Sequence, residues 1–428
     1  MSQQIKIEYV LIDLLKAAEY NPRKISKEAL EALTESIKRF EMVDPIIVNS
    51  APERMNVVIG GHMRLRGAKK LGHKTIPVVY LNIPDIKKEQ ELNLRLNANT
   101  GQWDYEKLKS FEVELLTDIG FSKDDLSEIW AENLEVVDDD FNEKEELAKI
   151  RKPETELGDL IILGSHRLIC GSSTDEEVLK RLFGEERASM IYSDPPYNIQ
   201  LDYNSGIGGK QQYGGNVKDD RTDDEYKKFL KQTLITALSV AHDDTHVFYW
   251  SDQTYIGLIQ ELYRELGIEN KRVCLWIKNS QNPVPSVAFN KCYEPCTYGV
   301  RGKPYLASQI QNLNEVMNKE LGTGNELLEE TLDHLDLWLV KRLFGKDYEH
   351  ATSKPPKLHE KAIRRCTKPG DIILDSFSGS ASTMIAAESL KRRVFAVELE
   401  PIFCDLAIRR FEKMTGTKAQ IIKNDEKA

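Results

Sequence analysis

The sequence DIILDSFSGSASTMIAAESLKRRVFAVELEP, residues 371–401, carries the strongest structural pattern in the chain. Its apolar start predicts a strand, its small residues predict a tight turn, the run from Ser382 predicts a helix, and VFAVELE predicts a second strand. Parallel strands joined by a helix are the βαβ unit of doubly wound α/β sheets. Each predicted strand carries an acid at its end, first Asp375 and then Glu398, which lies 19 positions after Gly379.

This turn has the pattern of a nucleoside-binding loop. Gly379 lets the backbone approach a ligand closely, and Glu398 can accept hydrogen bonds from both hydroxyls of a ribose. A dinucleotide site would carry more glycines for the pyrophosphate, and Asp375 would repel a phosphate but suits a ligand ammonium group. The loop therefore favours a cationic, phosphate-free nucleoside such as S-adenosylmethionine over NAD. A purely structural βαβ turn remains the alternative.

A second motif, MIYSDPPYNIQ at residues 190–200, follows a short apolar run. Pro195 and Pro196 have no amide hydrogen and fix φ, so they end the strand predicted for ASMIYS. The turn leaves Asp194 and the Pro195 carbonyl as hydrogen-bond acceptors, and Tyr197 as a stacking surface. These groups can hold the exocyclic amino group of a nucleic-acid base.

Strands and helices alternate from Leu157 onward, which predicts an α/β fold with a mostly parallel sheet covered by helices on both faces. Predicted strands include DLIILG, HRLICG, THVFYW, KRVCLWIK and CYEPCTYGV, and a helical stretch is expected over about 307–345. The carboxyl ends of parallel strands meet at one edge of the sheet. The nucleoside loop and the proline turn are therefore expected to form two pockets side by side.

Together the motifs resemble those of the amino-group DNA methyltransferases, which modify N6 of adenine or N4 of cytosine. SDPPYN is similar to their catalytic D-P-P-Y motif, LDSFSGSAST to their S-adenosylmethionine motif, and VELEP to their ribose-binding motif. ATSKPPKLHEKAIRRCTKPGD resembles the T-x-K-P-x-x-L segment that packs on the cofactor. The resemblance covers about residues 155–415, and the motif order is that of the β subgroup.

The resemblance implies a Rossmann-like, site-specific methyltransferase that moves a methyl group from S-adenosylmethionine to a base flipped out of double-stranded DNA. D-P-P-Y favours adenine N6 over cytosine N4. The implied catalytic residues are Asp194, Pro195, Pro196 and Tyr197. The implied cofactor-binding residues are Thr352, Lys354, Asp375, Phe377, Gly379, Ser380 and Glu398, and no metal is needed.

Other functions remain open on the sequence alone. Ser376 and Ala381 depart from the family's D-P-F-x-G-S-G-T loop, and Ser172 stands where relatives commonly place an aspartate. A DNA-binding adaptor with a degenerate methyltransferase domain is therefore one alternative, and an N4-cytosine enzyme is another. RNA and protein-glutamine methyltransferases use similar chemistry, but those families typically carry asparagine in place of Asp194.

The first hundred residues resemble the ParB N-terminal domain family, in the form often fused to methyltransferases. The resemblance rests on NPR (Asn21–Arg23), DPIIVN and GGHMRLRGAKKLG. Helices are expected for SKEALEALTESIKRF and after Gly61, and strands for PIIVN, NVVIGG and KTIPVVYLNI. His62 and Met63 depart from the family's G-E-R-R pattern, so CTP hydrolysis is not expected. We expect a packed or solvated histidine, and contact of His62 with a phosphate at the helix N-terminus is the alternative.

The 428 residues suggest more than one domain. We expect a smaller α/β ParB-like domain over residues 1–100, a helical segment and acidic linker over 101–152, and the methyltransferase domain over 153–428. Ser122 and Asp125 are expected to cap a helix in the middle segment. The run ENLEVVDDDFNEKEE is the acidic part of the linker.

Charge is unevenly distributed around a formal net value of −10. Residues 338–368 hold nine Lys/Arg and three acids, which indicates either a solvated helix face or a strip that contacts phosphates. Residues about 280–350 are the candidate target-recognition region. The candidate DNA-binding side chains are Lys341, Arg342, Lys346 and Lys357. The glycine-rich loop around Gly206–Gly215 is expected to close over the base or the DNA backbone.

The bulk sequence predicts a cytoplasmic protein. No signal-peptide pattern and no run of about 18 apolar residues is present. Six cysteines are scattered along the chain, and no second Cys or His pair accompanies Cys292 and Cys296 at zinc-ligand spacing. Relatives of the β subgroup often dimerise, so a homodimer is possible.

Overall fold

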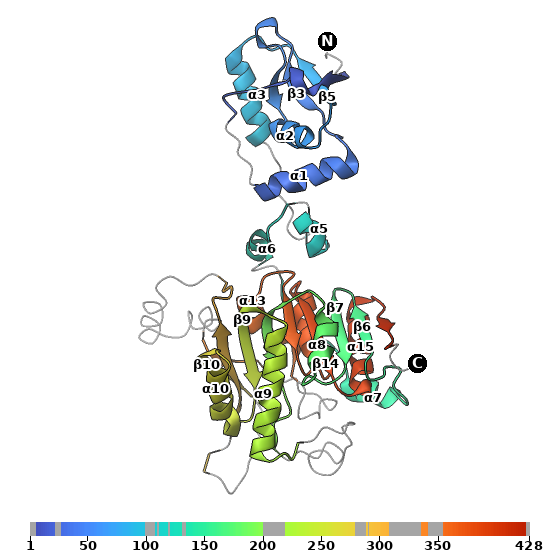
Figure 1. Ribbon diagram of the computed structural model, residues 1–428, viewed down its shortest axis with the longest axis vertical. Helices are drawn as coiled ribbons and strands as arrows, with labels where there is room; N and C mark the ends of the chain where they lie inside the picture. Colours follow the sequence, from blue (N-terminus) through green and yellow to red (C-terminus); the bar gives the residue numbers. More distant parts are fainter. Residues whose placement is uncertain are drawn as a thin grey trace, which may run out of the picture. The chain divides into compact units, whose positions relative to one another are not determined.

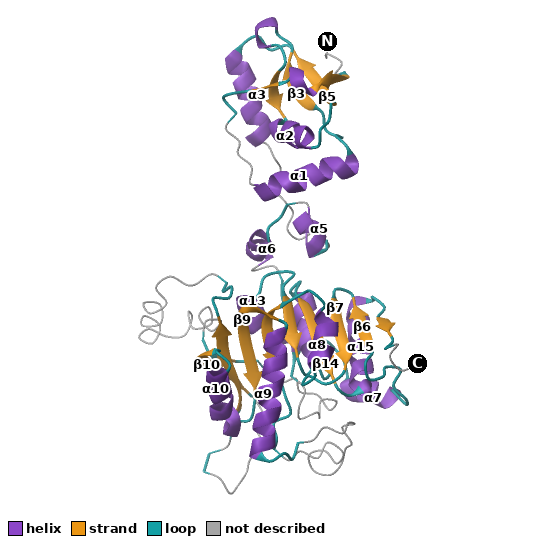
Figure 2. Cartoon of the chain, in the orientation of Figure 1, coloured by secondary structure: helices purple, strands orange, loops and turns teal. Residues whose placement is uncertain are grey.

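The computed structural model describes residues 6–21, 27–98, 108, 111–118, 120–130, 134–199, 219–278, 288–289, 291–307, 335–340 and 354–424. The chain forms two compact units, residues 1–130 and 131–428, each built from helices and a sheet (Figures 1 and 2). No helix in the described ranges is long and apolar enough to cross a membrane.

The first unit is a small α/β fold with a five-stranded sheet. The sheet order is β1 (Ile7–Leu11), β5 (Thr75–Leu81), β3 (Ile46–Asn49), β4 (Val57–Gly60) and β2 (Lys16–Ala17). Its helices are α1 (Lys27–Phe40), α2 (His62–Lys70), α3 (Ile86–Ala98), α5 (Val113–Asp118) and α6 (Lys123–Trp130). These elements confirm the predicted helix–strand order. Ser122 and Asp125 cap α6 reciprocally, as the sequence predicted.

His62 is a packed histidine at the start of α2. Gly61, with φ of 92°, turns the chain into the helix, and His62 Nε2 accepts a hydrogen bond from the backbone N–H of Ala18 at 3.2 Å. Burial lowers the pKa of the His62 imidazole. The histidine therefore connects two segments of this unit through a hydrogen bond, which confirms the expectation of a packed histidine.

The second unit holds a ten-stranded mixed sheet. Its order is β12 (Leu337–Trp338), β10 (Glu269–Ile277), β11 (Tyr293–Arg301), β9 (Ala241–Trp250), β8 (Ala188–Ser193), β13 (Ile372–Asp375), β14 (Arg393–Glu398), β7 (His166–Cys170), β6 (Leu160–Leu163) and β15 (Gln420–Ile422). The five central strands, from β9 to β7, are parallel. Antiparallel pairs flank them on both sides, and the edge strand β12 pairs parallel with β10. The mostly parallel sheet predicted from the sequence is therefore found at the centre, within a sheet that is mixed as a whole.

Helices cover both faces of this sheet. They are α7 (Glu143–Lys149), α8 (Glu176–Phe183), α9 (Asp223–Ser239), α10 (Ile256–Glu265), α13 (Pro356–Cys366), α14 (Ser382–Ser389) and α15 (Pro401–Thr415). Along β7, Arg167 donates to carbonyls of α8, whereas the neighbouring His166 packs against Phe411 of α15. Side chains alternate along a strand, so α8 and α15 lie on opposite faces. Figure 1 shows α9 and α10 in front of the sheet.

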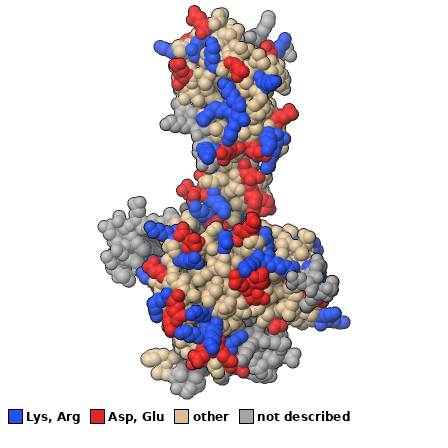
Figure 3. Space-filling model, viewed as in Figure 1, with Lys and Arg blue, Asp and Glu red and all other residues tan. Residues whose placement is uncertain are grey.

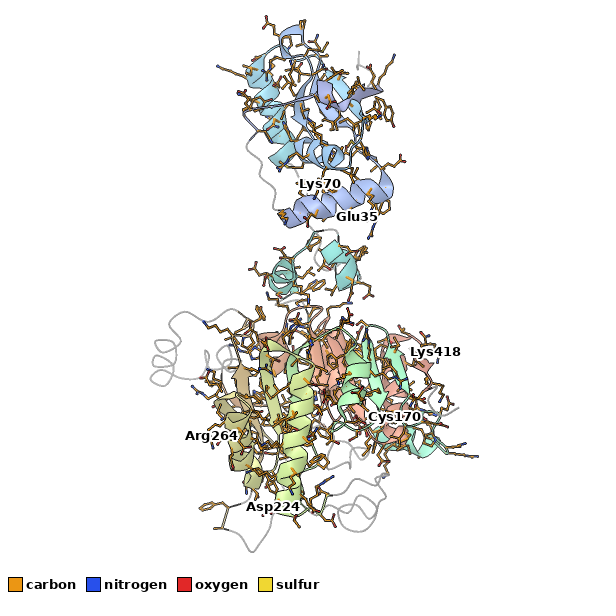
Figure 4. All side chains as sticks on the ribbon, in the orientation of Figure 1. Glu35, Lys70, Cys170, Asp224, Arg264 and Lys418 are labelled. Atoms are coloured by element: carbon orange, nitrogen blue, oxygen red, sulfur yellow. The ribbon has the colours of Figure 1, made fainter. Side chains whose placement is uncertain are left out.

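The core on the α8–α10 face is apolar and continuous. It joins side chains of the parallel strands to those of the three helices, including Ile191, Val247, Leu374, Phe395, Leu230 and Leu262. Side chains fill the space between the sheet and its helices, and Cys170 at the end of β7 is labelled among them in Figure 4. Such packing fixes the strand ends, and therefore the groups that follow them.

The acidic segment from residue 134 to residue 150 differs from the predicted linker, because it packs on the second unit. Phe141 is 1% exposed and forms a small apolar cluster with Ile150 and Leu406 of α15. Asp139 accepts two hydrogen bonds from Arg410, each at 2.7 Å. The apolar side chains within the acidic run anchor it, which composition alone did not indicate.

The candidate target-recognition region is described only in part. Residues 288–289, 291–307 and 335–340 are described, and they include β11 and β12. Leu337 and Trp338 pair with β10 as a short parallel strand, where a helix had been predicted. The rest of the predicted helical stretch lies outside the described residues.

Candidate active site

The candidate site lies where the chain reverses its direction of travel across the sheet. β8 and β13 are adjacent and parallel, with Ile191 opposite Leu374. After β8 the chain proceeds through α9 to β9 on one side, and after β13 it proceeds through α14 to β14 on the other. The crevice beyond the carboxyl ends of such strands is the usual ligand site of an open α/β sheet. Asp194 follows β8 there, and Asp375 ends β13.

The proline turn after β8 is held from two sides. Asn198 adopts φ of 55°, a left-handed conformation that asparagine tolerates, and its N–H donates to Asp219 Oδ1 at 2.7 Å. The Tyr226 hydroxyl of α9 donates to the Pro196 carbonyl at 2.7 Å. Within the described part of the chain, the Pro195 carbonyl accepts no hydrogen bond. The turn is thus rigid and leaves that carbonyl as an acceptor.

Lys354 lies against the aspartate of this turn. Its Nζ donates to Asp194 Oδ2 at 2.5 Å and to the Tyr197 hydroxyl at 3.0 Å. Tyr197 in turn donates to Asp194 Oδ1 at 2.8 Å. The Lys354 side chain is only 6% exposed. The resemblance had implied a cofactor-binding role for Lys354, whereas its contacts belong to the D-P-P-Y turn.

Glu294 of β11 completes this buried cluster. Its Oε2 lies 3.5 Å from Lys354 Nζ and 3.5 Å from the Tyr197 hydroxyl, and its Oε1 accepts from Lys278. We did not single out Glu294 or Lys278 from the sequence. The available signal was a lone acid within YEPCTYGV, an otherwise largely buried strand, because a charge there needs a partner.

The charges of the cluster support one another. Burial lowers the pKa of the Lys354 ammonium, but Asp194 and Glu294 outweigh it, so the net shift is upward. Burial raises the pKa of the Glu294 carboxyl, but Lys354 and Lys278 outweigh it and lower the pKa overall. Burial and then Asp194 raise the pKa of the Tyr197 hydroxyl well above its usual range. Lys354 and Glu294 are thus ionised, and Tyr197 keeps its proton.

The loop after β13 is closed by a hydrogen bond to the acid at the end of β14. Glu398 Oε2 accepts from the Gly379 N–H at 2.8 Å. Gly379 has φ of 50°, and a Cβ built on it meets no atom within 4 Å, so open space faces the backbone there. The Ser378 hydroxyl is buried and has no hydrogen-bond partner in the described part of the chain. These features fit a polar ligand that approaches the loop closely.

Two carboxyls at this loop have perturbed pKa values. Burial raises the pKa of Asp375 to about 7, although the Phe377 N–H and the Thr383 hydroxyl act in the opposite direction. Burial also raises the pKa of the Glu398 carboxyl. Buried carboxyls without a cationic partner are ready to bind a cation or a hydrogen-bond donor from a ligand.

Ser380 and Ala381 connect the loop to α14 and α15. Both the carbonyl and the hydroxyl of Ser380 accept hydrogen bonds from Arg410 at 3.0 Å. Ala381 is buried with φ of 63°, a conformation that usually requires glycine. The glycine that the family carries at this position would therefore suit this backbone conformation better than Ala381 does.

His359 of α13 links the two halves of the site. Its Nδ1 pairs with the Tyr192 hydroxyl of β8 at 3.0 Å, and its Nε2 pairs with the Ser382 hydroxyl of α14 at 2.9 Å. Burial, together with the Lys354 and Arg410 charges, lowers the pKa of His359 to about 3. The imidazole is therefore neutral and serves as a fixed connection between the two strand ends.

The structure brings together most of the residues predicted for the site. Asp194, Tyr197 and Lys354 form one cluster, and Asp375, Gly379 and Glu398 lie around the neighbouring loop. The Phe377 ring packs at 6.0 Å from that of Phe229. Predicted residues outside the described ranges are Thr352, Lys341, Arg342 and Lys346, and the same holds for Gly206–Gly215.

Candidate contacts with nucleic acid are few among the described residues. Lys357 has an exposed side chain in the first turn of α13, and its N–H donates to Asp138 Oδ1. Acidic and basic side chains are interspersed over the face seen in Figure 3. In the described ranges, no three His, Cys, Asp or Glu side chains are grouped to hold a metal ion.

Residues 188–409, just over half of the chain, match a protein family described as DNA methylase. The chain belongs to this family. The matched range contains the D-P-P-Y turn, the glycine loop and the Lys354–Glu294 cluster. Residues 1–100 of this methylase match a second family, described as the ParB N-terminal domain. Both resemblances inferred from the sequence are confirmed.

Curated relatives of the methylase carry the names of Type II methyltransferases. M2.DpnII of Streptococcus pneumoniae is 27% identical over 54% of this chain and 85% of its own length. M2.MboI of Moraxella bovis is 24% identical over 57% of this chain and 86% of its own. M.HinfI of Haemophilus influenzae is 25% identical over 54% of this chain and 64% of its own length.

Solved structures similar to the methylase include one for each unit. A crystal structure of M1.HpyAVI in complex with SAM is 20% identical, covers 57% of this chain and 97% of its own, and gives a TM-score of 0.40. The C-terminally truncated chromosome-partitioning protein ParB of Caulobacter crescentus, complexed with CTP-γ-S, is 21% identical. It covers 29% of this chain and 77% of its own, with a TM-score of 0.24.

Proposed function

We propose that this DNA methylase transfers a methyl group from S-adenosylmethionine to the exocyclic amino group of a base flipped out of duplex DNA, with adenine N6 as the target. The observation that carries the proposal is the pairing of β8 with β13, which sets the D-P-P-Y turn beside the glycine loop. Methyl transfer needs two adjacent pockets, and base flipping is needed because the amino group is not accessible inside the duplex.

The glycine loop fits the cofactor. Asp375 offers a carboxyl next to the cationic part of the ligand, Glu398 offers one to the ribose hydroxyls, and Gly379 leaves space for close approach. S-adenosylmethionine supplies a methyl group already activated by a sulfonium. The protein therefore has to orient the acceptor rather than activate the donor.

The D-P-P-Y turn fits the acceptor amine. The amino lone pair is conjugated with the ring, so the nitrogen must be held in a geometry that frees it. Asp194 accepts one N–H, and the Pro195 carbonyl accepts the other from a turn that Asp219 and Tyr226 hold rigid. Tyr197 provides the stacking ring. These groups orient the nitrogen and stabilise the positive charge that develops on it.

Asp194→Asn tests this assignment. The variant keeps the shape of the turn but loses a charged acceptor, so kcat for methyl transfer to DNA should fall by about 100-fold or more. Calorimetry should show unchanged S-adenosylmethionine affinity, because Asp194 belongs to the other pocket. Methyl transfer at the wild-type rate would refute the catalytic role.

Long-read sequencing of DNA from cells that express the chain tests the base and the site together. Methylation at adenine N6 within one sequence is expected, and methylation at cytosine N4 would correct the target base. A homodimer remains a prediction, and the mass of the purified protein in solution would test it.

A further inference from the structure

The ammonium group of Lys354 occupies Asp194, one of the two acceptors that the proposed reaction assigns to the target base. It donates to Asp194 Oδ2 at 2.5 Å and to the Tyr197 hydroxyl at 3.0 Å. It also lies over two aromatic rings, 4.8 Å from the centre of Trp250 and 5.4 Å from that of Tyr197. A carboxylate, a hydroxyl and two ring faces therefore surround one amine.

These contacts are the ones an exocyclic amino group would seek. Such a group also presents N–H donors, and the base that carries it stacks on aromatic faces. Both carboxylate oxygens of Asp194 are already engaged, Oδ1 by Tyr197 and Oδ2 by Lys354. A target amine that donates to Asp194 therefore competes with Lys354 for the same carboxylate.

Glu294 offers Lys354 another partner at short range. Its Oε2 lies 3.5 Å from Lys354 Nζ, while Lys278 holds the other oxygen of the carboxylate. The Glu294 side chain is largely buried, and Lys354 and Lys278 keep it ionised. A small displacement of the ammonium would bring it fully onto Glu294 and leave Asp194 Oδ2 free.

We propose that Lys354 is an internal surrogate for the target amino group, and that Glu294 is the positioning residue that receives its ammonium when the base binds. The inference rests on the proposed function, because it assumes that the base reaches Asp194. In the ligand-free protein, Lys354 would then be hydrogen-bonded to the catalytic aspartate until the target base displaces it.

The charge that develops during the reaction favours movement of the Lys354 ammonium from Asp194 to Glu294. The base nitrogen becomes cationic as it attacks the methyl group, and an ammonium held on Asp194 beside it would oppose that charge. Lys354, Lys278, Asp194 and Glu294 together carry no net charge. Moving Lys354 to Glu294 pairs both lysines with Glu294 and leaves Asp194 to the developing cation.

Lys354→Met is the first test, because the proposal predicts a gain. Removing the competitor should tighten binding of a duplex that carries the target site in unmethylated form, by about tenfold if the lysine occupies Asp194 nine-tenths of the time. Fluorescence anisotropy of the labelled duplex measures the change. A merely structural role for the lysine predicts weaker binding, and weaker or unchanged binding would overturn the proposal.

Glu294→Gln is the second test, and it does not depend on the first variant folding. The ammonium then loses its alternative partner and stays on Asp194, so kcat should fall by about tenfold or more, with S-adenosylmethionine affinity unchanged. Adding Lys354→Met to Glu294→Gln should restore part of this loss. A double variant no faster than Glu294→Gln alone would refute the exchange.

Matched controls come from a surface ion pair of the same chemistry. Lys231 of α9 pairs with Glu265 of α10 at 2.8 Å at the surface, and both side chains are partly exposed. Lys231→Met and Glu265→Gln should leave DNA binding and kcat unchanged. Wild-type protein that transfers no methyl group to unmethylated genomic DNA would instead show that the proposed function has failed, which is distinct from any result with the variants.

Discussion

Two neighbouring aspartates at the candidate site have opposite surroundings. Asp194 is engaged by Lys354 and Tyr197, whereas Asp375 has no cation among its hydrogen-bond partners in the described ranges, and its pKa is raised to about 7. The strands that carry them are adjacent. The Asp194 carboxyl therefore has its hydrogen-bond partners within the protein, whereas the Asp375 carboxyl would be stabilised in its charged form by a cationic ligand.

S-adenosylmethionine affinity should depend on pH through Asp375. The folded-state pKa is raised, so below pH 7 the carboxyl is mostly protonated, and a cationic ligand must displace that proton. The association constant should therefore rise by up to about tenfold per pH unit as the pH approaches 7, and level off above it. Calorimetry between pH 5.5 and pH 8, in buffers of different ionisation enthalpy, measures both the slope and the released proton.

Asp375→Asn is the control for this pH dependence. The amide cannot ionise, so the variant should bind more weakly and lose the part of the slope that Asp375 contributes. The amino group of the ligand titrates equally in both experiments, so the difference between the two proteins isolates the aspartate. Parallel slopes for wild type and variant would contradict the assignment.

Residue chemistry was predictable from the sequence where it is local. The D-P-P-Y turn and the loop around Gly379 each arise from a few adjacent residues, so their patterns are visible without a fold. The Lys354–Asp194 pair spans 160 positions and depends on how α13 packs against β8. No local pattern reports such a contact, and the lysine was consequently assigned to the cofactor pocket.

At the scale of elements, the acidic segment before β6 is attached through α15 to the glycine loop after β13. Arg410 is 1% exposed and binds both Asp139 and Glu143 on the segment, while its Nη1 also donates to both oxygens of Ser380. One guanidinium thus joins a segment outside the family match to the loop inside it. The segment was predicted as a linker because its many acidic residues are typical of a solvated chain. The signals against a linker were an aromatic residue within the acidic run, Phe141, and an arginine among the apolar residues of α15, Arg410.

Asp139→Ala should weaken both stability and cofactor binding. The buried guanidinium loses its bidentate partner but keeps Glu143, so the loss should be about 2 kcal/mol of the free energy of unfolding. S-adenosylmethionine affinity should also fall, because Arg410 no longer holds Ser380 in place. Urea denaturation measures the first effect and calorimetry measures the second.

Asp140→Ala is the matched control for this prediction. Asp140 is the next residue along the chain, and its side chain is exposed. A surface substitution of this kind should change the free energy of unfolding by less than about 0.5 kcal/mol. If Asp139→Ala lowered stability but left cofactor affinity unchanged, the connection from the acidic segment to the loop would be structural only.

At the scale of the whole molecule, each unit contains its own sheet and apolar core. The first unit buries residues such as Ile46, Val48 and Val78, and the second buries the helix-covered face of its parallel strands. The order of elements was predictable because strand and helix periods are strong in both. The boundary was not, since contacts divide the chain at residue 130 and assign the acidic segment to the second unit.

Two truncations should therefore behave differently. A chain of residues 131–428 keeps every described contact of the glycine loop, so it should fold and bind S-adenosylmethionine with the affinity of the full chain. A chain of residues 153–428 loses the Phe141 and Ile150 contacts, worth about 4 kcal/mol together, and also the Asp139 contact with Arg410. It should unfold at lower urea concentration and bind the cofactor more weakly. Equal stability and affinity for the two truncations would show that the acidic segment is a passive linker after all.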